Sequence, residues 1–201
     1  VLVNGLSASA SEILAAALQD YGRAIIVGDS KTHGKGSVQT VLGLSRSDTM
    51  GAIKVTNALF YRISGGSTQL RGVTPDIVIP SAFDFMDFGE DFLSNPMEWS
   101  TVRSAIYSPF SDLKGTIADL AERSETRRGH DERFVAYRAL LKRIEAMSTR
   151  EALPLNLEER RAQAVVVKEP LDMQNSLMAQ SEVEEEGEEG YRRLLTDLAA
   201  G

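Results

Sequence analysis

The 201-residue sequence contains no cysteine, only two histidines and no apolar run that approaches the roughly 18 residues of a membrane-spanning helix. Without cysteine there is no disulfide framework and no thiolate nucleophile, although this absence does not select a cellular compartment. The net charge of -7 argues against a general nucleic-acid-binding protein, because such binding needs cationic side chains that neutralise phosphates. The remaining composition, 42% hydrophobic and 25% charged, is ordinary for a globular protein.

The first 81 residues alternate strand and helix patterns, which predicts an α/β sheet. Apolar or β-branched runs predict strands at 1–3, 24–27, 37–42 and 51–63, and two prolines make 73–79 an edge strand or extended segment. A helix is predicted from Ser9 to Tyr21, ended by Gly22. It places four apolar residues on one face: Ile13, Leu14, Ala17 and Leu18.

The sequence changes character after residue 81 and becomes mostly helical. Residues 82–89 are aromatic and acidic without a clear period, whereas 111–123 and 130–147 have helical patterns. A charged helix is predicted after Leu155, a polar, acidic and flexible stretch at 168–190, and a short amphipathic helix at 191–200. We therefore expect two domains, 1–81 and 82–201. Because the chain begins inside an apolar run without an initiator Met, we expect it to be part of a longer protein.

The serine cluster at 7–11 stands where the first strand turns into the first helix. A sharp turn of this kind exposes a side chain, and the helix N-terminus supplies unpaired N–H groups and a positive dipole end. Ser9 is therefore a candidate nucleophile, and the N–H of Ala10 is the natural donor to an oxyanion. Alone, the cluster is also compatible with a plain helix cap made of small residues.

A serine nucleophile needs a base, and the candidates are Lys35 and His33. Burial disfavours the charged form of a lysine, and an uncharged amine is a competent general base. The glycines on both sides of Lys35 allow the backbone to approach closely. Gln39 lies four residues on in an extended segment, on the same side, where its neutral amide can hold the amine without restoring its charge. Alone, this motif is also compatible with a turn that carries a solvated lysine.

Taken together, the stretch SASASEILAAALQDYGRAIIVGDSKTHGKGSVQ resembles the core of the carboxyl-terminal processing peptidases, and specifically their tail-specific protease branch. The resemblance continues through FYRISGGSTQLRGVTPDIVIPS and, more weakly, through 93–99 and 153–163. It implies a partial crotonase/Clp-like protease core followed by a helical C-terminal extension. It also implies a Ser-Lys dyad, with Ser9 as nucleophile, Lys35 as base, Gln39 orienting the lysine, and Asp20 as an acid important for activity or local structure.

Two departures from the family pattern affect this reading. The loop before Lys35 is one residue longer than usual, and His33 stands where phenylalanine is common, which leaves a histidine-assisted variant open. The upstream half of the protease core and a PDZ domain, both expected in this family, are not in the sequence. We therefore expect the 201 residues alone to be inactive or nearly so, and to self-associate through exposed sheet edges.

The resemblance implies polypeptide substrates with accessible C-terminal tails, no metal or cofactor, no nucleic acid, and a periplasmic or cell-envelope location in a bacterium. The alternative is a non-catalytic interaction module that binds a partner through its helical part and the acidic run at 182–190. A third reading, an acyl-CoA enzyme of related architecture, lacks recognisable CoA-binding residues.

Overall fold

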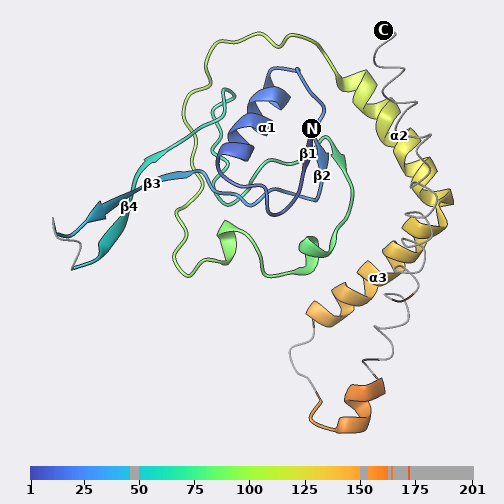
Figure 1. The fold of residues 1–201 in the computed structure, drawn as a ribbon. Coiled ribbons are helices and arrows are strands. Elements are labelled where there is room, and N and C mark those ends of the chain that lie inside the picture. The colour runs from blue at the N-terminus through green and yellow to red at the C-terminus, as the bar shows by residue number, and fades with distance from the viewer. Residues whose placement is uncertain (46–49, 150–153, 163, 165–171, 173–201) are drawn as a thin grey trace, which may run out of the picture. The chain divides into compact units, whose positions relative to one another are not determined.

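The computed structural model describes residues 1–45, 50–149, 154–162, 164 and 172. Its chain forms two compact units, Val1–Glu122 and Arg123–Gly201 (Figure 1). The predicted flexible stretch at 168–190, apart from Asp172, and the predicted helix at 191–200 lie outside the described residues. No helix in the described ranges is both long and apolar enough to cross a membrane.

A small parallel sheet and one helix form the centre of the first unit. Strands β1 (Leu2–Val3), β2 (Val27–Gly28) and β5 (Ile77–Val78) lie in the order β1-β2-β5, and helix α1 (Ala10–Asp20) connects the first two. The strands approach so closely that a Cβ on Gly28 would lie 1.8 Å from the Val3 carbonyl oxygen. This strand-helix-strand unit confirms the predicted α/β class, with β5 at an edge of the sheet as its prolines indicate.

The buried face of α1 differs from the predicted one. Ile13 and Leu14 are 48% and 59% exposed, whereas Ala15 and Ala16 are buried against Val3, Ile26 and Val73. The apolar face predicted from the sequence therefore includes two residues, Ile13 and Leu14, that do not contribute to the buried core. Alanines allow the helix to approach the sheet closely, and the same face carries the fully buried side chain of Glu12. The spacing of apolar residues alone does not show that the buried face of α1 carries the carboxylate of Glu12 where a large hydrophobic side chain is usual.

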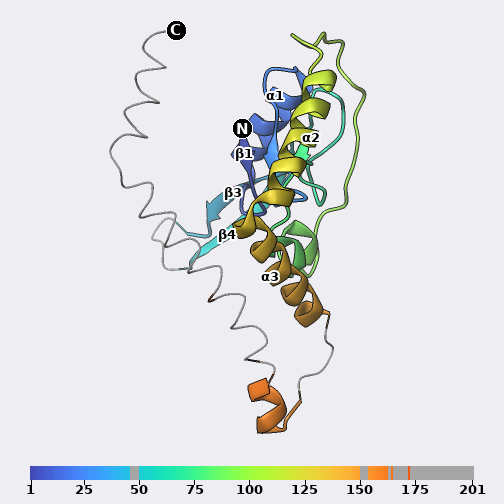
Figure 2. The same ribbon diagram turned by 90° about the vertical axis from the view of Figure 1, so that its right-hand side faces the viewer.

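A long hairpin leaves this centre. Strands β3 (Ser37–Gly43) and β4 (Ala52–Leu59) pair antiparallel, with an irregularity in register at Val38/Gln39. All residues of β4 except Leu59 are exposed, as are those of β3 after Ser37. The hairpin extends away from α1 and β1 toward the left of Figure 1, and in the turned view of Figure 2 it points away from the viewer. It exposes apolar side chains on described residues, including Val41 and Leu42.

The polypeptide after β5 returns along the first unit in short turns and extended segments. Two 3-10 turns, η1 (Ala82–Phe85) and η2 (Glu90–Phe92), follow β5. Further on, the Trp99 indole N–H donates to the Ser67 carbonyl at 2.8 Å, and the Arg71 guanidinium lies 3.6 Å from the Trp99 ring. The aromatic and acidic stretch at 82–89, whose sequence has no clear helical or strand period, contains η1 and does not form a long helix.

Two helices contain most of the remaining described residues. Helix α2 (Lys114–His130) contains the boundary between the units, and α3 (Glu132–Ser148) follows after Asp131. The Asp131 side chain accepts hydrogen bonds from the backbone N–H groups of Arg133 and Phe134, which caps α3. Leu140 and Leu141 are buried on α3. Both helices were predicted, although the first begins and ends later than its pattern indicated.

Candidate active site

Ser9 occupies the turn between β1 and α1 with an unusual backbone conformation. Its φ is 56° and its ψ is -109°, in a region that favours glycine. A non-glycine residue in such a conformation costs on the order of 1–3 kcal/mol and persists only where its surroundings impose it. Strained strand-to-helix turns are typical of nucleophile elbows, which present a serine hydroxyl beside a helix N-terminus. The backbone at Ser9 therefore has the kind of turn that the sequence predicts.

The first turn of α1 contains a backbone donor, the N–H of Ala10, that has no partner among the described residues. Ser9 N–H donates to Glu12 Oε2 at 2.7 Å, and Ser11 N–H donates to the Ala8 carbonyl at 3.2 Å. Between them, Ala10 is exposed, and its N–H has no acceptor in the part of the chain that the structure describes. The first N–H groups of a helix lack intrahelical partners and lie at the positive end of its dipole. Ala10 N–H is therefore available to an oxygen that develops negative charge.

Glu12 connects the serine turn to the lysine loop. Its side chain is 0% exposed, and its Oε2 accepts from Ser9 N–H at 2.7 Å and from Lys35 N–H at 2.9 Å. Because both donors bind one oxygen, the two backbone nitrogens lie less than about 5.6 Å apart. Glu12 Oε1 accepts from the Thr32 hydroxyl at 2.6 Å and from Gly34 N–H at 2.7 Å. A single buried side chain thus brings the backbones of the two predicted catalytic residues together, although the Ser9 hydroxyl and the Lys35 amine form no hydrogen bond with each other among the described contacts.

The sequence carries a local signal for part of this role. A serine followed three residues later by glutamate is the spacing of a capping box, in which the glutamate reaches back to the N–H of the cap residue. Ser9 and Glu12 have this spacing, and the Glu12 half of the arrangement is present. The bonds to Thr32, Gly34 and Lys35 have no such local signal, because those residues are 20 to 23 positions away.

The glycines beside Lys35 are explained by close backbone contacts. Gly34 has a φ of 92°, and its carbonyl accepts from Leu70 N–H at 2.8 Å. A Cβ on Gly36 would lie 2.6 Å from Ser67 Oγ, and Gly36 N–H donates to Gln69 Oε1 at 2.9 Å. Lys35 itself is half-buried, and its amine has no ion pair with any described residue. No carboxylate in those ranges therefore holds the amine in its charged form by direct contact.

Gln39 and Asp20 lie apart from this cluster. Gln39 is exposed on β3, and its amide nitrogen donates across the hairpin to Thr56 Oγ1 at 3.4 Å. Asp20 ends α1, about 16 Å along the helix from Ser9. It accepts from Arg62 Nε at 3.0 Å and Nη2 at 2.6 Å, with side chains that are 9% and 21% exposed. Asp20 thus fastens the segment after β4 to the end of α1, and the orienting role of Gln39 stays a prediction.

His33 contacts the segment that follows β5. Its ring Nε2 lies 3.6 Å from Glu90 Oε2, and its ring packs edge-on against Phe88 with centroids 5.3 Å apart. Its backbone N–H donates to the Ser7 carbonyl at 3.0 Å. The backbone of His33 therefore borders the serine cluster, while its ring is engaged with residues 88–90. No group of three or more potential metal ligands occurs among the described residues.

Comparisons with known proteins divide the chain near residue 81. The sequence pattern of peptidase family S41 matches residues 1–79, and that of the C-terminal domain of tail specific protease matches residues 83–194. A tail-specific protease of Haemophilus influenzae is 39% identical over 171 residues, which are 81% of this chain and 24% of that protein. A carboxy-terminal-processing protease of Bartonella bacilliformis is 56% identical over 79 residues, 39% of this chain and 17% of its own.

Among solved structures, a photosystem II D1 C-terminal processing protease is 44% identical, covering 40% of this chain and 20% of its own, with a TM-score of 0.35. The chain thus spans a quarter or less of the length of these relatives.

Proposed function

The chain belongs to peptidase family S41 and carries the C-terminal domain of tail-specific proteases, and on that premise we propose that it contributes a Ser-Lys dyad to a serine endopeptidase. The observation that carries the proposal is the shared oxygen of Glu12, which binds the backbone N–H groups of Ser9 and Lys35. The strained turn at Ser9 and the unbound Ala10 N–H support it.

The proposed reaction is acyl transfer. The uncharged Lys35 amine takes the proton of Ser9 Oγ, and the oxygen attacks the carbonyl carbon of the scissile peptide. Ala10 N–H donates to the oxyanion that forms. The protonated lysine then gives its proton to the leaving amine, which breaks the C–N bond and leaves an acyl-enzyme. Water, deprotonated by the same lysine, hydrolyses that ester and restores Ser9.

We further propose that the substrates are polypeptides cleaved at or near their C-terminal tails, in a bacterial periplasm or cell envelope. The names of the relatives support tail processing. Because this chain matches only 24% of the Haemophilus relative, we expect substrate-binding surfaces, including a PDZ domain and a second oxyanion donor, to come from outside these 201 residues. For the same reason we expect the 201 residues alone to be inactive.

The test compares the 201-residue chain with the same chain joined to the part of the Haemophilus relative that it does not match. We expect only the joined protein to cleave an unfolded test protein. Ser9→Ala and Lys35→Ala should each lower kcat by about 1,000-fold or more, because each removes one half of the dyad.

Matched controls are Ser11→Ala, in the same serine cluster, and Lys54→Ala, an exposed lysine on β4. Both should retain activity, as should His33→Ala. Cleavage by Lys35→Ala at the rate of the parent would exclude the dyad and make His33 the first candidate base. Absence of cleavage by the joined parent protein would favour the interaction module.

A further inference from the structure

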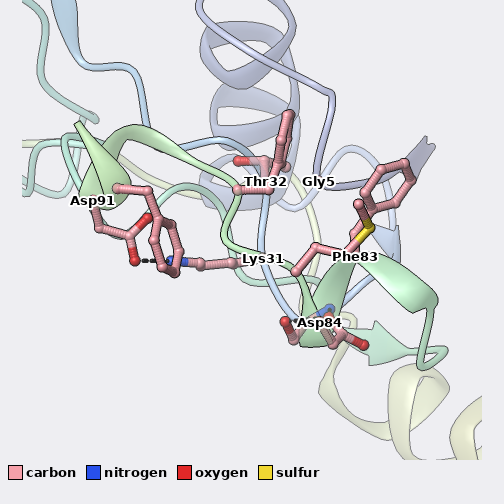
Figure 3. A pocket seen from close by; sticks show the side chains of 10 residues that line it. Gly5, Lys31, Thr32, Phe83, Asp84 and Asp91 are labelled. Atoms are coloured by element: carbon pink, nitrogen blue, oxygen red, sulfur yellow. Dashed lines mark hydrogen bonds and ion pairs between the residues drawn. The ribbon is translucent and has the colours of Figure 1, made fainter. Parts of the chain in front are cut away.

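The segment that begins the C-terminal domain contacts the loop that leads to Lys35. Ser30 donates to Asp84 through both its N–H and its hydroxyl, and the Lys31 amine lies 2.6 Å from Asp91 Oδ2. Lys31, Asp84 and Asp91 line a cavity between the two segments (Figure 3). The volume of this cavity is about 170 Å³. The side chains of Lys31 and Asp91 are 35% and 36% exposed, so solvent screens this ion pair and it holds the two segments together only weakly.

Glu90, by contrast, is a buried member of this segment, 8% exposed. Its backbone N–H donates to the His33 carbonyl at 2.9 Å, and its Oε1 accepts from Gln69 Nε2 at 3.1 Å. Its Oε2 lies 3.6 Å from His33 Nε2. Glu90 thus contacts the lysine loop directly at His33, on the N-terminal side of Lys35. It also contacts Gln69, which binds the loop at Gly36, on the C-terminal side of Lys35.

Gln69 transmits the second contact. Its side chain is 0% exposed, and its Oε1 accepts from Gly36 N–H at 2.9 Å. A backbone N–H can only donate, so the amide of Gln69 must turn its oxygen to Gly36 and its NH2 group the other way. That NH2 group needs a buried acceptor, and Glu90 Oε1 supplies it. The hydrogen bond to Glu90 Oε1 therefore helps to hold the side-chain amide of Gln69 in the orientation in which its oxygen accepts from Gly36 N–H.

We infer that Glu90 is a positioning residue for Lys35, acting through Gln69 and through the carbonyl of His33. The inference rests on the proposed function, since the position of Lys35 affects catalysis only if Lys35 is the base. Glu90 lies in the part matched by the C-terminal domain of tail specific protease, whereas Lys35 and Gln69 lie in the part matched by peptidase family S41. The C-terminal domain thereby contributes a buried side chain to the support of the lysine loop.

Three variants test the inference. Glu90→Ala removes the acceptor for Gln69. Glu90→Gln keeps a carbonyl oxygen that can accept the same hydrogen bond. Asp87→Ala is the control, because Asp87 is an exposed acid three residues earlier with no hydrogen bond or ion pair to any described residue.

The first measurement is amide hydrogen exchange in the 201-residue chain. In Glu90→Ala we expect exchange at Gly36 to accelerate at least tenfold, while Ala16 in α1 keeps its protection. Glu90→Gln should stay within about threefold of the parent, and Asp87→Ala should match it. Unchanged exchange at Gly36 in Glu90→Ala would overturn the inference. Equally faster exchange at Ala16 would also overturn it, because that result would indicate general unfolding and not a local change in the lysine loop.

The second measurement is peptidase activity in the joined protein described above. We expect Glu90→Ala to lower kcat by about 10- to 100-fold with KM within twofold, because a small misplacement of a catalytic group is costly to the chemical step. Glu90→Gln should recover most of kcat. A Glu90→Gln variant as slow as Glu90→Ala would overturn the role of the Gln69 bond. If the joined parent itself cleaves nothing, the proposed function fails, and the exchange data alone decide whether Glu90 holds the loop.

Discussion

Glutamate side chains have different structural roles in the two compact units. In the first unit, Glu12 is 0% exposed and its four hydrogen bonds come from three backbone N–H groups and one hydroxyl. In the second unit, the Glu125 side chain is 55% exposed and pairs with Arg128 and Arg138. The buried carboxylate fixes backbone conformation at a site, while the exposed one links two helices. The comparison teaches that burial, more than charge pairing, indicates where a carboxylate shapes the backbone.

The largest effect should come from removing Glu12. Glu12→Ala leaves buried donors without an acceptor, so we expect the free energy of unfolding to fall by about 3 kcal/mol or more. In the joined protein we expect peptidase activity to be lost as well. Urea unfolding of the 201-residue chain and cleavage of an unfolded protein measure the two effects.

Glu12→Gln sharpens this test. Each Glu12 oxygen accepts at least one backbone N–H, so the NH2 group of a glutamine faces a donor whichever way the amide turns. We expect Glu12→Gln to be nearly as unstable as Glu12→Ala. Glu98→Gln, at an exposed position in the same unit, serves as control. A stable, active Glu12→Gln would show that the four hydrogen bonds do not hold the site.

A smaller effect of opposite sign should appear at Ser9. Glycine adopts a φ of 56° without strain, whereas alanine does not. We expect Ser9→Gly to be about 1 kcal/mol more stable than Ser9→Ala, although both lack the hydroxyl and should be inactive. Thermal unfolding of the two variants measures the difference. Equal stabilities of Ser9→Gly and Ser9→Ala would show that the backbone at residue 9 is not strained.

The smallest effect should be the response of the second unit to acid. The hydrogen bond from Arg138 lowers the pKa of Glu125 below its ordinary 4.5, and the Phe134 N–H lowers that of Asp131 below 3.8. A lowered acid pKa stabilises the folded form above the ordinary value, and this contribution is lost as pH falls through the folded pKa. We therefore expect the stability of α3 to be constant above about pH 5 and to decline below about pH 4.5.

Nuclear magnetic resonance signals of Leu140 and Leu141 report on this decline. Glu125→Gln should make it shallower, because one of the two titrating acids is gone. Glu132→Gln, an exposed acid in the first turn of α3, should leave it unchanged. A Glu125→Gln profile identical to that of the parent would show that the exposed pairs add nothing measurable.

The sequence predicted elements that have local signals. The helix after the serine cluster, its end at Gly22 and the strand from Ser37 all follow from periodicity and turn residues, and the structure confirms them. The strand predicted at 24–27 is observed only at Val27–Gly28, because short parallel strands depend on neighbours that are distant in sequence. The first family match ends at residue 79 and the second begins at residue 83, and packing divides the chain after Glu122, so the domain bounds 1–81 and 82–201 stay a prediction.

What sequence reasoning could not supply are the polar contacts that join distant segments. An acid at the end of a helix opposes the helix dipole, and the partner that offsets this for Asp20 is Arg62, 42 residues away. Gln69 and Glu90 have no local sequence signal, since a buried amide and a buried carboxylate cannot be told from surface residues in a linear pattern. Their roles depend on which backbone donors the fold brings beside them.

The order of these contacts along the chain has a consequence for the time at which the site is completed. Gly36 binds Gln69, 33 positions later, and Gln69 binds Glu90, 21 positions later again. A ribosome adding about 5–20 residues per second makes Glu90 roughly 3 to 11 s after Gly36. During that interval the serine turn and the lysine already exist, but the last buried support of the lysine loop does not. Under the proposed function, a nascent chain would thus carry the proposed nucleophile, Ser9, before the loop of the proposed base, Lys35, is fully supported, and a newly made protein would gain proteolytic competence only after Glu90 is made.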